Sequence, residues 1–360
     1  MADNPSSQGG QRRRMWQCSL VRFLFIGAGA IGTYVGGSLA VAGHDVVFTE
    51  QPAAAEAIAA SGLQLTRGER TTHVRDFAIF GSPADALASG EFDVAVCALK
   101  SFDTEAAITG LLATGKPVPP VLSLQNGVAN EPLLRRLLGA DRVVAGTVTT
   151  AVGKPGPGQV VEEKLRGIGI ALDHPLGESL IDALNDAGLH AIGYPEPDAM
   201  KWSKLFTNLQ GNATSAILDE PVFALFSDPR SYGIELAVLR ECLAVMTALG
   251  LRPVDLPGTP VRALALSTRL PRFIAKPILT RALGAGRGDK MPSFHIDLYA
   301  GRGLTEVRFL NGAVAETGER LGVPTPANRV LTDTLEALSR GEQPLDTYRH
   351  NPDALLALLA

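Results

Sequence analysis

The stretch VRFLFIGAGAIG, residues 21–32, decides the fold of this 360-residue chain. Residues 21–26 form a short apolar run, interrupted only by Arg22, that ends at a glycine as a buried parallel strand does. The next six residues have the spacing of a dinucleotide-binding turn: Gly27, Ala28, Gly29, Ala30, Ile31 and Gly32. The first glycine permits a tight turn, the second lets backbone approach a pyrophosphate, and the third lets helix and strand pack closely. The alternative is an incidental glycine-rich turn.

The residues after this turn complete a strand, helix and strand unit. Apolar residues recur at helical spacing over residues 31–42, Gly43 ends the run, and residues 45–49 are typical of a second strand. Further short apolar runs occur at residues 93–99 and 121–124, with helical stretches between them. The chain is therefore predicted to be an α/β protein with an N-terminal doubly wound, Rossmann-type domain.

The second half of the chain has a different pattern. Strands are predicted at 143–152, 159–163 and 167–172, and Lys154 to Gly158 is predicted to be a turn. From about Pro195, long segments of helical period follow, at 199–218 and 231–249. We predict a disordered tail over 1–20, a dinucleotide-binding domain over 21–195, and a mainly α-helical substrate or dimerisation domain over 196–360. A homodimer is one expected assembly.

Composition restricts the classes of partner. Hydrophobic residues make up 46% and charged residues 19%, as in a globular protein, and no apolar run is long enough to span a membrane. The net charge of -4 gives no basic field for nucleic acid. The three cysteines are dispersed, and the six histidines lack metal-ligand spacing. We expect a cytoplasmic protein with no metal, nucleic acid or membrane partner. The alternative, an export signal beginning at Arg12, is disfavoured because Arg22 interrupts the apolar run.

Glu50 bears on the choice of cofactor. It lies at the end of the second predicted strand, 18 residues (50 − 32) after the last glycine, where an acid hydrogen-bonds the adenosine ribose. An anion there repels a 2′-phosphate, and the neighbouring Thr49, Gln51 and Pro52 offer no cation to receive one. The sequence therefore favours NAD over NADP, unless Glu50 simply begins a loop.

A polar row in the second domain provides candidate chemistry. Lys204, Asn208 and Asn212 are spaced at i, i+4 and i+8, which places them on one face if residues 200–217 form one helix. Asparagine is a poor interior helix residue unless it has a hydrogen-bonding role, so a cleft-facing row is favoured over a solvated stripe. A lysine can stabilise negative charge on a carbonyl oxygen and deliver a proton to it.

A stretch rich in Pro, Gly and Arg separates the predicted helices of the second domain. Residues 251–292 contain Arg262, Arg269, Arg272, Lys276, Arg281, Arg287 and Lys290. One interpretation is a solvated helix with loops, and the other is a basic lid over an anionic substrate.

Several motifs together resemble those of ketopantoate reductases, in order from about Val21 to Leu338. They are the glycine turn, Leu99-Lys100-Ser101, Gln125-Asn126-Gly127, Lys201-Trp202-Ser203-Lys204-Leu205 with Asn208 and Asn212, and residues 293–311. The resemblance implies that Lys204 is the general acid for the keto oxygen. It also implies that Glu306 orients Lys204 or a substrate hydroxyl.

The resemblance implies roles for six further residues. Asn126 would hydrogen-bond near both nicotinamide and substrate, whereas Leu99 and Lys100 would line the cofactor side. Asn208 and Asn212 would contact the substrate, and Ser293 would face its carboxylate. Read individually, Lys100 or Ser293 could be a loop residue, and Glu306 could be a helix-start acid favoured by the macrodipole.

Departures from the family pattern leave the substrate open. Members that use NADP usually carry an arginine just after the second strand, where this chain has Gln51, and Val222 replaces an asparagine that helps to hold the substrate. We expect reversible hydride transfer between the cofactor and a small 2-oxo acid, with ketopantoate as the leading case. The alternatives are an NAD-dependent dehydrogenase of another secondary alcohol and a non-catalytic NAD-sensing protein.

Overall fold

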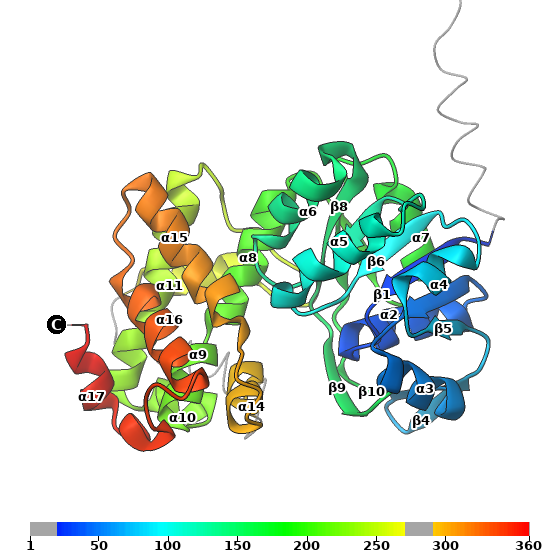
Figure 1. Cartoon of the computed structure of the whole chain (residues 1–360). Helices are drawn as coiled ribbons and strands as arrows, with labels where there is room; N and C mark the ends of the chain where they lie inside the picture. The colour runs from blue at the N-terminus through cyan, green and yellow to red at the C-terminus, as the bar shows by residue number, and fades with distance from the viewer. Residues whose placement is uncertain (1–19, 271–290, 360) are drawn as a thin grey trace, which may run out of the picture. The chain divides into compact units, whose positions relative to one another are not determined.

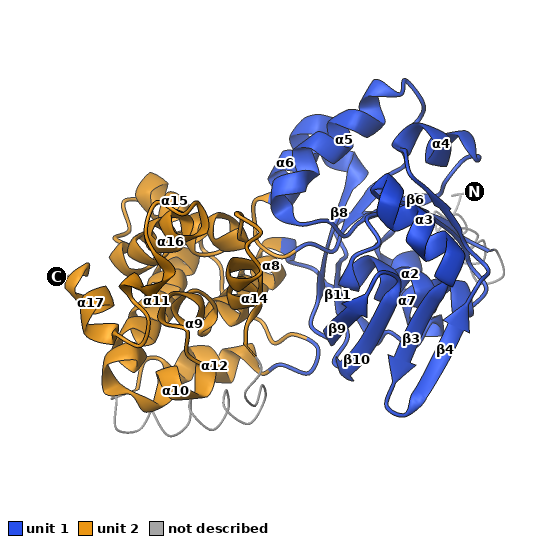
Figure 2. Ribbon diagram, turned by 60° about the horizontal axis from the view of Figure 1, so that its bottom comes forward, with its two compact units in different colours: residues 1–125, 130–197, 257–259 blue, residues 126–129, 198–256, 260–360 orange. Residues whose placement is uncertain are grey.

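The computed structural model describes residues 20–270 and 291–359, which form two compact units (Figures 1 and 2). The first unit comprises the described chain up to Gln125, Asn130–Pro197 and Pro257–Thr259. The second comprises Asn126–Ala129, Asp198–Leu256 and the described residues from Pro260 onward. The short segment Asn126–Ala129 therefore clusters with the second unit, although it follows a strand of the first.

A doubly wound sheet is the framework of the first unit. In the described residues its eight strands have the order β12-β11-β8-β7-β6-β1-β2-β5, parallel from β8 to β5, with β11 antiparallel to β8. Their bounds are β1 Arg22–Ile26, β2 Asp45–Thr49, β5 Ala78–Phe80, β6 Val94–Cys97, β7 Val121–Ser123, β8 Val143–Val148, β11 Ile168–Ala171 and β12 Ala191–Tyr194. The predicted Rossmann-type fold is confirmed.

Helices cover both faces of this sheet. Leu24 and Ile26 of β1 are buried in a cluster that includes Ile108 of α5 (Thr104–Ala113). On the alternate face of β1, the Phe25 ring packs on Phe48 with a centroid distance of 5.2 Å, as the period of two in a strand requires. The other helices of this unit are α2 Ala30–Val41, α3 Pro52–Ser61, α4 Pro83–Ala88, α6 Asn130–Leu138 and α7 Gly177–Asp186.

A second sheet in this unit corrects one prediction from the sequence. Its described strands have the order β4-β3-β10-β9, with bounds β3 Leu63–Arg67, β4 Arg70–Val74, β9 Ala151–Gly156 and β10 Gln159–Lys164. The prediction of a turn over Lys154 to Gly158 was wrong for its first three residues, which belong to β9. Pro155 is tolerated there because β9 is an edge strand, where a missing N–H breaks no ladder.

Helix α2, which begins at the glycine turn, packs against both sheets. A Cβ at Gly36 would lie 2.6 Å from the Phe48 ring, and a Cβ at Gly37 would lie 2.7 Å from Leu65 of β3. The Tyr34 hydroxyl donates to Glu162 of β10 at 2.6 Å, and its burial raises the pKa of this phenol. Close packing on two sides therefore fixes the helix that carries the turn.

The described part of the second unit is helical. Its longest helix is α11, Pro229–Ala248, and the others are α8 Pro197–Leu209, α9 Asn212–Leu218, α10 Val222–Ser227, α12 Val261–Ser267, α14 Ser293–Tyr299, α15 Asn311–Leu321, α16 Pro326–Ser339 and α17 Pro352–Ala357. The prediction of one continuous helix over 199–218 was wrong. Gly211 adopts a left-handed conformation (φ 69°), and its N–H donates to the buried Glu235 carboxylate at 2.7 Å. The chain is thereby broken between α8 and α9.

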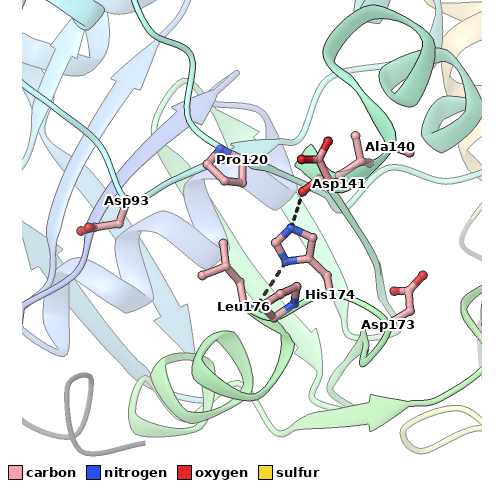
Figure 3. Close-up of a pocket in the computed structure, with 9 residues that line it drawn as sticks. Asp93, Pro120, Ala140, Asp141, Asp173, His174 and Leu176 are labelled. Atoms are coloured by element: carbon pink, nitrogen blue, oxygen red, sulfur yellow. Dashed lines mark hydrogen bonds between the residues drawn. The ribbon is translucent and has the colours of Figure 1, made fainter. Parts of the chain in front are cut away.

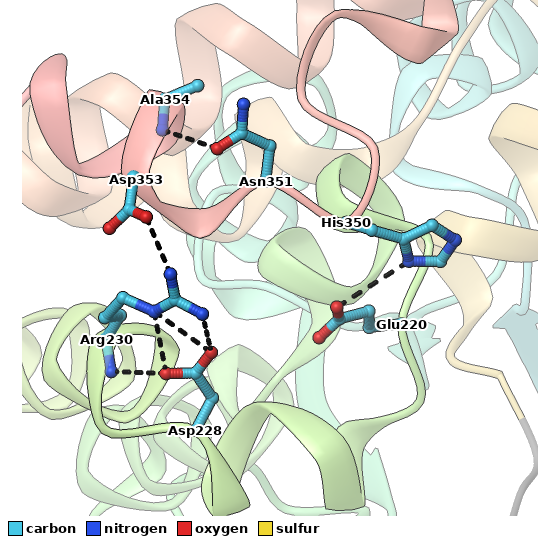
Figure 4. Close-up of polar contacts among 7 residues, drawn as sticks. All are labelled: Glu220, Asp228, Arg230, His350, Asn351, Asp353 and Ala354. Carbon is cyan, nitrogen blue, oxygen red and sulfur yellow. Dashed lines mark hydrogen bonds and ion pairs between the residues drawn. The ribbon is translucent and has the colours of Figure 1, made fainter.

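The C-terminal segment is tied to this unit by polar contacts (Figure 4). Arg230, at the start of α11, pairs with Asp228 at 2.7 Å and with Asp353 of α17 at 2.6 Å. The backbone N–H of His350 donates to the Leu218 carbonyl at 2.9 Å. These contacts hold α17 against the helices that follow α9.

Candidate functional site

The glycine turn joins β1 to α2 at the carboxyl edge of the parallel strands. Gly27 has a φ of 97°, which disfavours any other residue, and its N–H donates to the Thr49 carbonyl of β2 at 2.9 Å. The first N–H to bond within α2 is that of Thr33, to Gly29 at 2.9 Å. The helix start has no side-chain cap and no acid in its first turn. The N–H groups of Ala30, Ile31 and Gly32 can therefore bind an anion.

The three glycines of the turn differ in what requires them. A Cβ at Gly27 would lie 2.7 Å from Leu99, and one at Gly32 would overlap the Gly27 carbonyl. The nearest atom to a Cβ at Gly29 would be the Ala98 carbonyl oxygen, 3.9 Å away, and Gly29 has an ordinary φ of −70°. The protein itself therefore requires Gly27 and Gly32, whereas Gly29 leaves space for a group from outside. In dinucleotide-binding turns, the glycine at this position lets the backbone approach the pyrophosphate.

Glu50 contacts the glycine turn directly. One carboxylate oxygen accepts the Ala28 N–H at 2.7 Å and the other accepts the Gln51 N–H at 2.8 Å. The side chain is partly buried. Glu50 therefore does more than begin a loop in this structure, because its carboxylate holds the backbone of the turn, and its proposed contact with a ribose stays a prediction.

A buried polar network that the sequence reasoning missed holds the segment that begins at Leu99. The Gln125 amide donates to the Leu99 carbonyl at 3.1 Å and to Thr104 at 2.7 Å, and Asn130 donates to Ser101 at 3.1 Å. Leu99 touches the glycine turn, and Lys100 precedes a short 3₁₀ helix, Ser101–Asp103. The network joins the chain segments after β6 and β7. The sequence feature that could have predicted this network is that polar residues such as Ser101 and Gln125 closely follow apolar strand runs.

Asn126 and Asn208 meet within the second unit. The Asn208 amide of α8 donates to the Asn126 side-chain oxygen at 2.9 Å. Next to Asn126, Gly127 has a φ of 85°, and a Cβ there would lie 2.7 Å from the Phe309 carbonyl. The segment after β7 therefore packs against both α8 and the 3₁₀ helix Glu306–Phe309.

The two predicted catalytic residues belong to these same elements. Lys204 lies one helical turn before Asn208 on α8 and is partly buried. Glu306 begins the 3₁₀ helix that contacts Gly127, and only 6% of its surface is exposed. The preceding Thr305 has a buried hydroxyl with no hydrogen-bond partner among the described residues. Such burial is atypical of an ordinary helix-start acid.

Asn212 and Ser293 lie together at the start of α14. The Asn212 side-chain oxygen accepts the Phe294 N–H at 3.2 Å, and Ser293, the first residue of α14, is exposed. Because Gly211 interrupts the helix, Asn212 does not continue the face that carries Lys204 and Asn208. The predicted row is therefore two residues on α8 and a third that contacts α14.

Only part of the basic stretch before Pro292 lies within the described residues. Arg262 of α12 pairs with Asp255 at 2.6 Å, and its side chain is 72% exposed. This contact agrees with a solvated helix for that residue. Arg272, Lys276, Arg281, Arg287 and Lys290 all lie outside the described residues, so the lid stays a prediction.

A pocket of about 440 Å³ lies at the opposite edge of the sheet (Figure 3). Its lining includes Asp93, Pro120 and Val143, at the amino ends of β6, β7 and β8. Both ring nitrogens of His174 are occupied there, by the Asp141 carbonyl at 2.9 Å and the Leu176 N–H at 3.1 Å. Ligands of open α/β sheets bind at the carboxyl ends of strands, so this pocket is not the dinucleotide site.

Two further findings concern metals and membranes. The described chain holds no group of three or more His, Cys, Asp or Glu side chains arranged to bind a metal. Cys97 and Cys242 are buried and form no disulfide, and burial raises the pKa of the Cys242 thiol. No helix in the described ranges combines the length and apolar character needed to cross a membrane.

Comparison with known proteins covers most of the chain. Residues 23–171 match the family described as ketopantoate reductase PanE/ApbA, and residues 198–339 match its C-terminal part. A 2-dehydropantoate 2-reductase of Archaeoglobus fulgidus is 28% identical, over 89% of this chain and 98% of the relative.

Solved structures agree with these matches. A PanE/ApbA family ketopantoate reductase from Ralstonia eutropha JMP134 superposes with a TM-score of 0.75 at 29% identity, covering 89% of this chain and 99% of that one. D-mandelate dehydrogenase, determined with NADH and anilino(oxo)acetate, shares the fold with a TM-score of 0.72 at 23% identity, covering 89% and 98%.

Proposed function

This chain belongs to the ketopantoate reductase family of nicotinamide-dependent oxidoreductases, and we propose that it reduces a small 2-oxo acid with NADH. Ketopantoate, which would be reduced to pantoate, is the leading substrate. The observation that carries this proposal is the 2.9 Å contact between Asn208 and Asn126. It joins the helix of Lys204 to Asn126, the residue to which the family resemblance assigns contacts with nicotinamide and substrate.

Proton transfer is the task of the lysine. The bound dinucleotide supplies hydride to the carbonyl carbon. As negative charge develops on the carbonyl oxygen, Lys204 donates a proton to it, and in the reverse direction Lys204 accepts that proton. Glu306 orients the ammonium group or a substrate hydroxyl. Asn126, Asn208 and Asn212 bind the polar groups of the substrate, and Ser293 donates to its carboxylate.

The preference for NADH rests on the charge of Glu50. Its carboxylate lies 2.7 Å from the Ala28 nitrogen, so a 2′-phosphate near this turn would meet a negative charge. The neighbouring Gln51 and Pro52 supply no cation. We expect kcat/KM to be at least about tenfold higher with NADH than with NADPH, a difference of about 1.4 kcal/mol.

Kinetics of the purified full chain test the proposal. Ketopantoate is offered with NADH or NADPH, and loss of the reduced cofactor is followed by absorbance. Turnover with NADH is expected. Folded protein that consumes neither cofactor contradicts the proposed reaction, whereas faster turnover with NADPH contradicts the cofactor preference alone.

A second candidate is an NAD-dependent dehydrogenase of another secondary alcohol. Val222 favours this candidate, because the family usually has a polar asparagine at that position. The Val222 side chain is 2% exposed and packs against Gly211. A pocket without that amide would recognise fewer hydroxyl groups on its substrate. Screening 2-hydroxy acids with NAD⁺ separates the two, because the second candidate predicts that an acid other than pantoate has the highest kcat/KM.

A further inference from the structure

Arg166 lies at the carboxyl edge of the main sheet, away from the glycine turn. It precedes β11, which runs antiparallel to β8, and Ile168 of β11 pairs with Val148 at the end of β8. Arg166 is therefore beside the end of β8, at the same edge as the ends of β1, β6 and β7. The order β1-β6-β7-β8-β11 places four strand spacings, about 19 Å, between Arg166 and the turn.

The surroundings of Arg166 leave part of its guanidinium without an acceptor. Its Nη1 donates to the Thr149 carbonyl at 3.2 Å, and its backbone N–H donates to the Thr150 hydroxyl at 3.1 Å. The buried Nε has no hydrogen-bond partner among the described residues. The aliphatic part of the side chain is covered by Gly258, where a Cβ would lie 2.9 Å from the Arg166 Cβ.

Within the described ranges, no carboxylate lies within ion-pair distance of this guanidinium, in contrast to Arg230 with Asp228 and Asp353. Burial lowers the pKa of Arg166, and no acidic neighbour opposes that effect. A partly buried guanidinium with free donors favours an anion as its missing partner. Because burial removes competing water, such a contact would be stronger than one at the surface.

The order of the strands indicates which anion it is. Glu50 marks the adenosine side of the site at β2, and the start of α2 takes the pyrophosphate beside β1. A dinucleotide that continues across the edge places its nicotinamide on the side of β6 and β7. The substrate would then lie next along the edge, on the side of β8 and β11. Because the cofactor phosphates would be bound at α2, the anion expected beside Arg166 is the acid group of the substrate.

We propose that Arg166 binds the carboxylate of the 2-oxo acid and thereby determines specificity for anionic substrates. This inference rests on the function proposed above. The Nε and Nη groups would donate charge-assisted hydrogen bonds to the carboxylate oxygens. Arg166 supplies the positive charge for this contact.

Arg166→Met is the main test, with ketopantoate and its neutral lactone compared as substrates or competitive inhibitors at saturating NADH. The KM for the acid is expected to rise about 30-fold, equivalent to about 2 kcal/mol. The constants for the lactone and for NADH should change less than about threefold. An unchanged KM for the acid, or an equal rise for acid and lactone, overturns the inference.

Arg142→Met is the matched control. Arg142 is also partly buried, donates to a backbone carbonyl, that of Val118, and stands just before β8 at the opposite edge of the sheet. This variant should bind the acid as the wild type does, and an effect equal to that of Arg166→Met overturns the inference.

Arg166→Lys keeps the positive charge and decides the question if Arg166→Met does not fold. It should raise the KM for the acid about fivefold and leave the lactone unaffected. No acid-specific rise overturns the inference. Wild-type protein that is folded but reduces no 2-oxo acid refutes the proposed function and this inference together. Turnover by the wild type without an acid-specific effect of Arg166 refutes this inference alone.

Discussion

The glycine turn and the Lys204 region differ in how far along the chain their contacts reach. The hydrogen bonds of the turn join residues at most 22 positions apart, as from Thr33 to Gly29 and from Ala28 to Glu50. The Lys204 region depends on hydrogen bonds that span 82 residues, from Asn126 to Asn208 and from Asn212 to Phe294. The hydrogen bonds that shape the turn are therefore encoded more locally than those of the Lys204 region, although Leu99 also packs on the turn from a distant segment. Variants of the two regions should fail in different ways.

Lys204→Ala should have the largest effect on activity. Removal of the general acid is expected to lower kcat by about 10³-fold, because the developing oxyanion loses its proton donor. The KM for NADH and the melting temperature should change little, since the glycine turn belongs to the other unit. Stopped-flow absorbance and calorimetry measure these quantities.

Lys204→Arg is the control for this prediction. Arginine keeps the charge but does not release a proton near neutral pH, so kcat should remain low. If Lys204→Ala left turnover unchanged, the assignment of the general acid would be wrong. A cofactor that still binds tightly to the inactive variant would show that the two regions act separately.

The fold of the first unit was predictable because its pattern is local. Residues 21–49 contain a buried strand, a glycine turn, an amphipathic helix and a second strand in succession, and the structure has each within about two residues. The strands β3, β4 and β5 escaped prediction. β3 and β4 carry polar residues such as Gln64, Arg70 and His73, and β5 has only three residues. β3 also pairs with the distant β10, which no local pattern reveals.

Gly32→Ala and Gly29→Ala separate the structural from the binding role of the turn. In Gly32→Ala the new Cβ overlaps the Gly27 carbonyl, which should cost about 3 kcal/mol of the free energy of unfolding of the first unit. In Gly29→Ala the nearest atom is 3.9 Å away, so unfolding without cofactor should be unchanged. The Kd for NADH should nevertheless rise about tenfold, because the methyl group occupies the space left for the pyrophosphate.

Thermal unfolding with and without NADH measures both effects. The melting temperature of Gly32→Ala should be lower than that of the wild type even without cofactor. The melting temperature of Gly29→Ala should match the wild type without cofactor and rise less than the wild type when NADH is added. A lower melting temperature of Gly29→Ala without cofactor would mean that the protein, rather than the dinucleotide, requires this glycine.

The substrate region was predictable only in part. The spacing of Lys204, Asn208 and Asn212 assumed one helix, and sequence periodicity does not show that Gly211 is held in a left-handed conformation by Glu235, 24 residues away. The sequence does not single out Arg166, because a lone arginine between two strands has no distinctive pattern. The position of Arg166 beside the end of β8 follows only from the antiparallel pairing of β11 with β8. Long-range pairing of this kind is absent from any local window.

Loss of the hydrogen bond between Asn126 and Asn208 should lower activity less than Lys204→Ala does, and a double-mutant cycle measures this loss. Loss of their hydrogen bond is expected to cost about 1 kcal/mol, or about fivefold in kcat/KM for the oxo acid. Asn126→Ala, Asn208→Ala and the double variant are compared. If the contact matters for the site, the double variant should be less impaired than the sum of the two single effects. Strict additivity would show that the two residues act independently and would weaken the proposal that rests on this contact.

Asp219→Asn should have the smallest effect, and on stability rather than chemistry. Burial opposes ionisation of Asp219, but the hydrogen bond from His295 of α14 at 2.6 Å and the charge of Arg349 at 2.8 Å outweigh it and lower the pKa of the carboxyl group. A carboxylate with a depressed pKa stabilises the fold above its unfolded pKa of about 3.9, and this contribution disappears as the pH falls through the lower folded value. We expect the variant to be about 1 kcal/mol less stable from pH 5 to 7. The difference should narrow below about pH 4.

Urea unfolding at pH 7, 5 and 3 measures this difference in stability. Asp346→Asn is the control, because Asp346 faces the same arginine at 3.6 Å but is 83% exposed. A difference that stayed constant down to pH 3 would show that the charge of Asp219 is not what holds α14 to the end of α9.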